Sequence, residues 1–83
     1  MAKDTITTTN SHVQVASGEC VITILKRGNG TLFINESGTD TNANRYGSAD
    51  VKVNDQLSQN SAVATFVRGA GTKPWVLLID GTI

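Results

Sequence analysis

Hydrophobic and polar residues alternate along most of this chain with the two-residue period of β-strands. The clearest run covers residues 20–35, where two segments rich in Val, Ile, Leu, Thr and Phe flank Arg27-Gly-Asn-Gly30. Glycine and asparagine accept positive φ at low cost, so the chain can reverse direction between the segments. The pattern predicts two strands joined by a glycine-rich hairpin turn.

A second run of the same design covers residues 62–80, with the glycine-containing segment 69–73 in its middle. Pro74 lacks an amide donor, which suits the first residue of a strand. In this later strand Trp75, Leu77 and Ile79 share one face, as Cys20, Ile22 and Ile24 do in the earlier run. Apolar side chains also occupy the opposite faces, so we expect two central strands that are covered on both sides.

Shorter alternating segments complete the pattern. Residues 11–16 place Val13 and Val15 on one face, and residues 50–54 alternate in the same way. Residues 36–49 are polar and predict a long surface loop, residues 55–60 predict a turn, and no segment shows helical periodicity. We therefore predict an all-β protein, a compact antiparallel β-sandwich or barrel of about seven short strands. Residues 1–10 are a Thr-rich N-terminal arm or edge strand, and residues 11–83 form a single β domain.

One pentapeptide occurs twice. Arg27-Gly-Asn-Gly-Thr31 returns 41 residues later as Arg68-Gly-Ala-Gly-Thr72. Two interpretations stay open: an internal duplication, or turn chemistry that any tight hairpin shares. If both tips lie at one end of the fold, Lys26, Arg27, Arg68 and Lys73 form a small basic cluster. Such a cluster is either a solvated edge or a contact for an acidic partner surface.

Length and charge narrow the classes of function. With 83 residues the chain is long enough for one thin core. Seven basic and seven acidic residues give a formal net charge of zero, which argues against nucleic-acid and membrane partners. The N-terminus lacks the hydrophobic core of a signal peptide. We therefore expect synthesis in a host cytoplasm without signal-peptide secretion.

Candidate chemistry is sparse. His12 and Cys20 are the single residues of their types, and no Gly-x-Ser-x-Gly motif occurs. Asp40-Thr-Asn-Ala-Asn44 begins like a calcium loop, but Arg45 and Val51 replace the required glycine and glutamate. We expect Cys20 to be a buried strand residue. The sequence predicts no enzyme, no catalytic residue, no cofactor and no metal site.

The chain resembles small all-β virion proteins of bacteriophages, of the head decoration (cement) or tail-appendage type. The similarity rests on Gly28-Asn-Gly-Thr-Leu-Phe-Ile-Asn35, the polar loop after it, Val51-Lys-Val53 and the closing strand Trp75–Ile79, in a chain rich in Thr, Asn, Ser and Gly. The resemblance implies a structural role in a virion, through protein contacts with capsid or tail subunits. It also implies a homo-oligomer, with a trimer as one form.

The expected function is therefore a non-enzymatic capsid decoration protein that stabilises the head through subunit contacts. The alternative is a ligand- or receptor-binding β-module, such as a tail-fibre or carbohydrate-binding domain, with Tyr46 as its aromatic platform. The candidate partner contacts lie in the N-terminal arm, the long loop and the glycine turns: Thr5, Thr7, Thr9, Lys26, Arg27, Arg45, Tyr46, Arg68 and Lys73.

Overall fold

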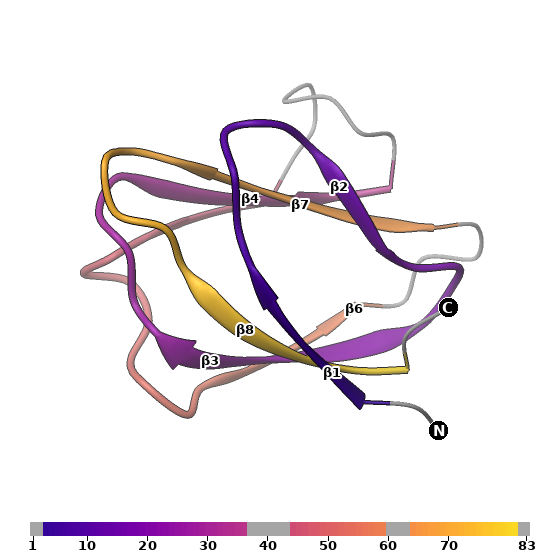
Figure 1. The fold of residues 1–83 in the computed structure, drawn as a ribbon. Helices are drawn as coiled ribbons and strands as arrows, with labels where there is room; N and C mark the ends of the chain where they lie inside the picture. Colours follow the sequence, from indigo (N-terminus) through magenta and orange to yellow (C-terminus); the bar gives the residue numbers. More distant parts are fainter. Residues whose placement is uncertain (1–2, 37–43, 60–63, 82–83) are drawn as a thin grey trace.

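The computed structural model describes residues 3–36, 44–59 and 64–81 of the chain (Figure 1). These residues form eight antiparallel strands and no helix. The strands are β1 (Lys3–Thr7), β2 (Val13–Ala16), β3 (Cys20–Lys26), β4 (Thr31–Asn35), β5 (Asn44–Gly47), β6 (Gln56–Gln59), β7 (Thr65–Ala70) and β8 (Val76–Asp80). The predicted all-β antiparallel sandwich is confirmed, with eight strands where about seven were expected.

The strands follow the order of a jelly roll. β1 pairs with β8, β2 with β7, β3 with β6 and β4 with β5, so the first four strands run beside the last four like the arms of one long hairpin. Rolling this hairpin brings β3 against β8 and β4 against β7. The result is two four-stranded sheets, β1-β8-β3-β6 (sheet A) and β2-β7-β4-β5 (sheet B), which is the arrangement of an eight-stranded jelly roll.

The core lies between the inner faces of the two sheets (Figure 1). The alternation predicted the inner residues of the central strands correctly, since each of the two predicted sets is buried on one face. Trp75 is the largest buried side chain and is fully covered. The buried apolar cluster comprises Val15, Ala16, Cys20, Ile22, Ile24, Leu32, Ile34, Val51, Val67, Trp75, Leu77 and Ile79.

The two predicted hairpins are wrong. β3 lies in sheet A and β4 in sheet B, and β7 and β8 are likewise divided between the sheets. Each glycine-containing connection therefore passes from one layer to the other instead of joining paired neighbours. β3 and β8 are the central strands of sheet A, as predicted, but a two-layered fold covers them on one side. Their outward residues remain partly exposed, which corrects the expectation of two covered faces.

The chain between the two glycine-containing connections also differs from the prediction. Strand β5 lies within the predicted loop 36–49, and β6 lies where a turn was expected. Residues 50–54, predicted as a strand, form turns and irregular backbone, in which Val51 is buried while Val53 is half exposed. Residues 37–43, the remainder of the predicted loop, lie outside the described residues.

An irregularity in β2 overturns one further prediction. The register of β2 against β7 shifts between Gln14 and Ala16, which indicates a β-bulge. A bulge changes the alternation of side chains, so Val13 and Val15 do not share a face. Val13 is 40% exposed and Val15 is 2% exposed.

Thr8 anchors the connection between β1 and β2 to the core. It is buried, its N–H donates to the Trp75 carbonyl at 2.9 Å, and its Oγ1 accepts a hydrogen bond from the Trp75 N–H at 2.9 Å. Gly69 leaves room for this hydroxyl, because a Cβ there would collide with it. Residues 3–7 of the predicted arm are thereby held as β1, the edge strand beside β8.

Candidate functional site

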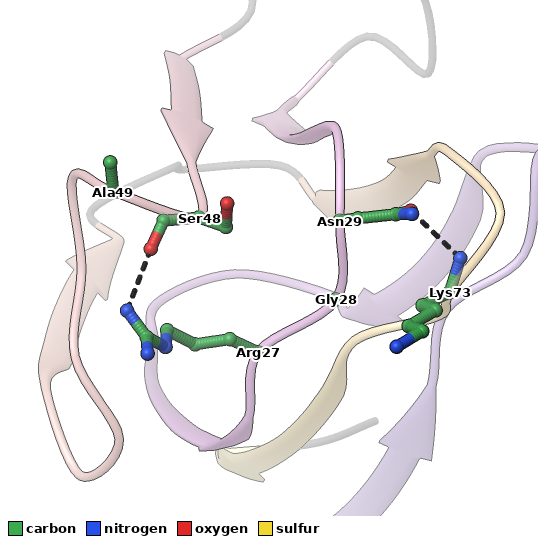
Figure 2. A pocket seen from close by; sticks show the side chains of 6 residues that line it. All are labelled: Arg27, Gly28, Asn29, Ser48, Ala49 and Lys73. Carbon is green, nitrogen blue, oxygen red and sulfur yellow. Dashed lines mark hydrogen bonds between the residues drawn. The ribbon is translucent and has the colours of Figure 1, made fainter.

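Several connections converge at one end of the sandwich and enclose an open pocket of about 620 Å³. Figure 2 shows its lining residues, which come from the β3–β4, β5–β6 and β7–β8 connections. They are Arg27, Gly28, Asn29, Ser48, Ala49 and Lys73. The two copies of the repeated pentapeptide thus reach the same end of the fold, where Asn29 bonds to Thr72.

The polar groups of this pocket hold the connections to one another. The Arg27 guanidinium donates to the carbonyl oxygens of Ser48 and Val51, at 2.8 and 3.3 Å. The Asn29 side chain donates to Thr72 Oγ1 at 2.6 Å and accepts from the Lys73 N–H at 2.8 Å (Figure 2 marks the second bond). These bonds give Arg27 and Asn29 a structural role in fixing the end of the fold.

Gly28, the first glycine of the repeat, lies where no larger side chain fits. A Cβ at this position would collide with the Lys73 carbonyl oxygen and would lie 2.6 Å from Trp75 Cδ1. The β3–β4 connection therefore rests directly on the buried tryptophan. In the second copy Arg68 and Gly69 lie inside β7 instead of after a strand. The two copies are not equivalent in position, so the predicted basic cluster does not form as one group.

The outer face of sheet A carries aliphatic and hydroxyl side chains at its centre. Val21, Thr23, Val76 and Leu78 point away from the core on the central strands, and each is partly exposed. Thr5 and Thr7 of the edge strand β1 lie opposite Leu78 and Val76 and extend this surface. On the other edge, β6 adds Ser58 and Gln56. Lys3 and Asp80 face each other in register at one end of this face, and Lys26, in register with the outward Val76, adds a charge at the other end.

The outer face of sheet B has a different chemistry. Phe33 of β4 lies in register with Arg68 of β7 on one side and Arg45 of β5 on the other. The two guanidinium carbons lie 5.2 and 5.6 Å from the centre of the Phe33 ring, within the range of cation–π attraction. Arg68 Nε also donates to the Asn10 carbonyl at 2.7 Å. The row Arg68-Phe33-Arg45 is therefore a fixed cationic strip across three strands.

The structure distributes the predicted contact residues over several places. Thr5 and Thr7 lie on the outer face of sheet A, and Thr9 borders a shallow hollow beside Gly69. Lys26 is exposed at the end of β3, whereas Arg27 and Lys73 line the end pocket. Arg45 and Arg68 come together on sheet B. The structure therefore brings together Arg27 with Lys73 and Arg45 with Arg68, and it places Thr5, Thr7 and Lys26 on the outer face of sheet A.

Tyr46 does not form the exposed aromatic platform that the sequence suggested. It is in register with Leu32, whose side chain is buried, and it packs against the core. The outward aromatic residues are Phe33 and Phe66, both partly exposed. The alternation around Leu32 and Ile34 already contained the signal that Phe33 points outward.

The described part of the chain holds no group of three His, Cys, Asp or Glu side chains placed to bind a metal ion. No described helix is long and apolar enough to span a membrane. Cys20 is buried as predicted, and burial raises the pKa of its thiol, against a smaller opposing effect of a hydrogen bond with Thr65. Residues 40–43 of the calcium-like motif lie outside the described residues.

Comparison of the chain with protein-family models, with curated protein sequences and with solved structures gives no match. The candidate surfaces therefore have to be judged by their own chemistry.

Proposed function

We propose that the chain is a non-enzymatic structural protein of a virus particle, and specifically a capsid decoration protein that stabilises the head through subunit contacts. Two observations support this role. The sequence resembles small all-β virion proteins of bacteriophages, and the strand order is that of the jelly roll, a fold common among viral capsid domains. Lectins use the same fold, so a surface has to carry the argument.

The observation that carries the proposal is the outer face of sheet A. Its centre combines partly exposed aliphatic side chains, Val21, Val76 and Leu78, with threonines, and its charged strand residues lie at the two ends. Depletion of charge at the centre is typical of protein interfaces. Covering about 50 Å² of remaining apolar surface on one such residue contributes roughly 1 kcal/mol before association costs.

The occupant of this face is a second copy of the same chain. A two-fold pairing brings identical surfaces together, and the opposite charges of Lys3 and Asp80 make their end of the face self-complementary. The zero net charge of the chain removes long-range repulsion between copies. A face spanned by the two larger Cα extents, 28 and 26 Å, is similar in area to one standard interface of about 800 Å² per partner, so the pairing would occupy most of the face.

Analytical ultracentrifugation over a range of concentrations tests the pairing. We expect concentration-dependent dimers for the unchanged chain and monomers for Leu78→Lys, because the new charge would be buried without a partner. Phe66→Lys is the matched control, an outward and partly exposed position on a central strand of sheet B, and it should still dimerise. A monomeric unchanged chain, or equal loss in both variants, contradicts pairing through sheet A.

Gradient-purified virus particles from the natural source test the virion role separately. We expect the chain in the head fraction in many copies, detected by quantitative mass spectrometry. A chain that dimerises but is missing from the particles contradicts the virion role and leaves the pairing intact.

The alternative, a ligand- or receptor-binding β-module, is favoured by one observation, the outward Phe33 and Phe66 of sheet B. A glycan array with the Phe66→Ala variant as control distinguishes the two functions. Binding of a defined glycan that this variant loses would favour the carbohydrate-binding function over the structural one.

A further inference from the structure

The outer face of sheet B differs from a solvated surface in the way its charges are held. Arg68 and Arg45 approach Phe33 from the two strands that flank β4. Arg68 is further fixed by its bond to the Asn10 carbonyl. Side chains held in this way lose less conformational freedom when a partner binds. The row is therefore organised before any partner arrives.

Arg45 supplies the exposed end of this row. It makes no hydrogen bond or ion pair with the residues that the structure describes, apart from its contact with the Phe33 ring. Its guanidinium thus keeps N–H donors for a partner, in the planar fork that fits an oxygen pair.

The neighbouring outward positions favour an anionic partner. The strand residues around the row are uncharged: Gln14, Phe66 and Asn35 on one side, and Ala70, Thr31 and Gly47 on the other. These strand positions contribute no carboxylate, and the carboxylate nearest to them in the sequence is that of Glu36, which directly follows β4. Because the whole chain has zero net charge, attraction at this face is local and not a consequence of bulk charge.

We infer that the outer face of sheet B is a docking surface for an acidic protein, with Arg45 binding its carboxylates and Arg68, held by the Asn10 carbonyl and over the Phe33 ring, fixing the other end of the row. Arg forks bind carboxylates through two parallel hydrogen bonds. Single-stranded nucleic acid fits less well, because bases need an open aromatic face, and arginines from both flanking strands lie over Phe33. A sugar ring would meet the same obstacle. The inference goes beyond the proposed function, and it holds whether or not the chain belongs to a virus particle.

Fluorescence anisotropy with a labelled deca-glutamate peptide tests the inference at low salt. We expect saturable binding, weakened about tenfold by Arg45→Ala, because a charge-assisted hydrogen bond contributes about 1.5 kcal/mol. Arg45→Lys keeps the charge and loses the fork, so we expect an intermediate loss of about threefold. Lys52→Ala removes an exposed cation elsewhere and should change affinity less than twofold.

Arg45 is exposed, so its variants should fold, and circular dichroism would verify this. Phe33→Leu gives a second test, because it releases both guanidinium groups without removing charge, and it should weaken binding as well. Three results would overturn the inference: no binding by the unchanged chain, an equal loss in Lys52→Ala, or tighter binding of a ten-nucleotide oligo(dT) or a heparin decasaccharide than of the glutamate peptide.

Discussion

The two outer faces of this sandwich stand on the same core and differ in almost everything else. Sheet A presents Val21, Val76 and Leu78 among threonines, whereas sheet B presents Phe33 between two arginines. Both faces come from strands with the same alternation of buried and partly exposed residues. The inner positions therefore determine the fold, and the outer positions distinguish one face from the other.

This difference separates two kinds of contact. An uncharged aliphatic face gains free energy by losing water and has little directional preference. A face with fixed arginines gains less from burial and more from selecting the charge and geometry of its partner. A small protein that has both kinds of face can bind a second copy of itself through one face and a different protein through the other.

The largest effect concerns the shared core. Leu77→Ala in sheet A and Ile34→Ala in sheet B each remove a fully buried aliphatic side chain. We expect each to lower the free energy of unfolding by about 3 kcal/mol. Urea unfolding, followed by Trp75 fluorescence and by far-ultraviolet circular dichroism, measures both changes. Val53→Ala, at a half-exposed position, is the control and should cost less than about 0.5 kcal/mol.

The same experiment tests whether the two faces share one cooperatively unfolding core. If one core carries both faces, fluorescence and circular dichroism must report one transition in every variant. A shift of the circular dichroism transition in Ile34→Ala with an unchanged Trp75 transition would mean that the sheets unfold separately. The two faces would then belong to two independent layers.

The alternation of apolar and polar residues within short segments was sufficient to predict the central strands. The runs through Cys20–Lys26 and Val76–Asp80 alternate strongly, because inward residues must be apolar in any sandwich. The edge strands β5 and β6 escaped prediction for the opposite reason, whereas the edge strands β1 and β2 lie in segments predicted as an arm or edge strand and as an alternating strand. Asn44–Gly47 and Gln56–Gln59 have polar residues on most positions, since an edge strand buries little. Their existence follows from pairing with β4 and β3, which a short sequence window does not contain.

The glycine turns show a second limit of local pattern. Gly28 and Gly30 indicate that the chain reverses, but they do not indicate which sheet the next strand joins. That choice depends on the rolling of the whole hairpin and on the contact between Gly28 and Trp75. The contact residues on sheet B were only partly predictable for the same reason. Arg45 and Arg68 were singled out separately, and cross-strand register brings them to one ring.

A smaller effect on stability is expected from Cys20, which lies where the two sheets meet. Cys20 of β3 is buried and hydrogen-bonded to Thr65 of β7. Burial raises the pKa of its thiol, so the folded chain retains this proton at a pH where the unfolded chain has lost it. Stability should therefore fall above about pH 8.5, with a slope of at most about 1.4 kcal/mol per pH unit.

Urea midpoints between about pH 8 and pH 9.5 measure this fall in stability. Cys20→Ala lacks the thiol and should show a flatter profile over the same range. A variant profile as steep as that of the unchanged chain would assign the alkaline weakening to other groups. In that case the junction of the sheets would not be the pH-sensitive part of the core.

The smallest effect tests whether charge is held differently on the two faces. A double-mutant cycle with Phe33→Leu and Arg45→Gln should give a coupling of about 0.5 kcal/mol, because the guanidinium lies over the ring. The matching cycle on sheet A, Lys3→Gln with Asp80→Asn, should give less than about 0.3 kcal/mol, because exposed charges in register interact weakly. Thermal unfolding of the seven proteins, the unchanged chain, four single variants and two double variants, measures both couplings. Equal couplings would mean that the arginines of sheet B are no better organised than ordinary surface charges. The distinction between sheet A as a face for self-association and sheet B as a face that selects a charged partner would then have no physical basis.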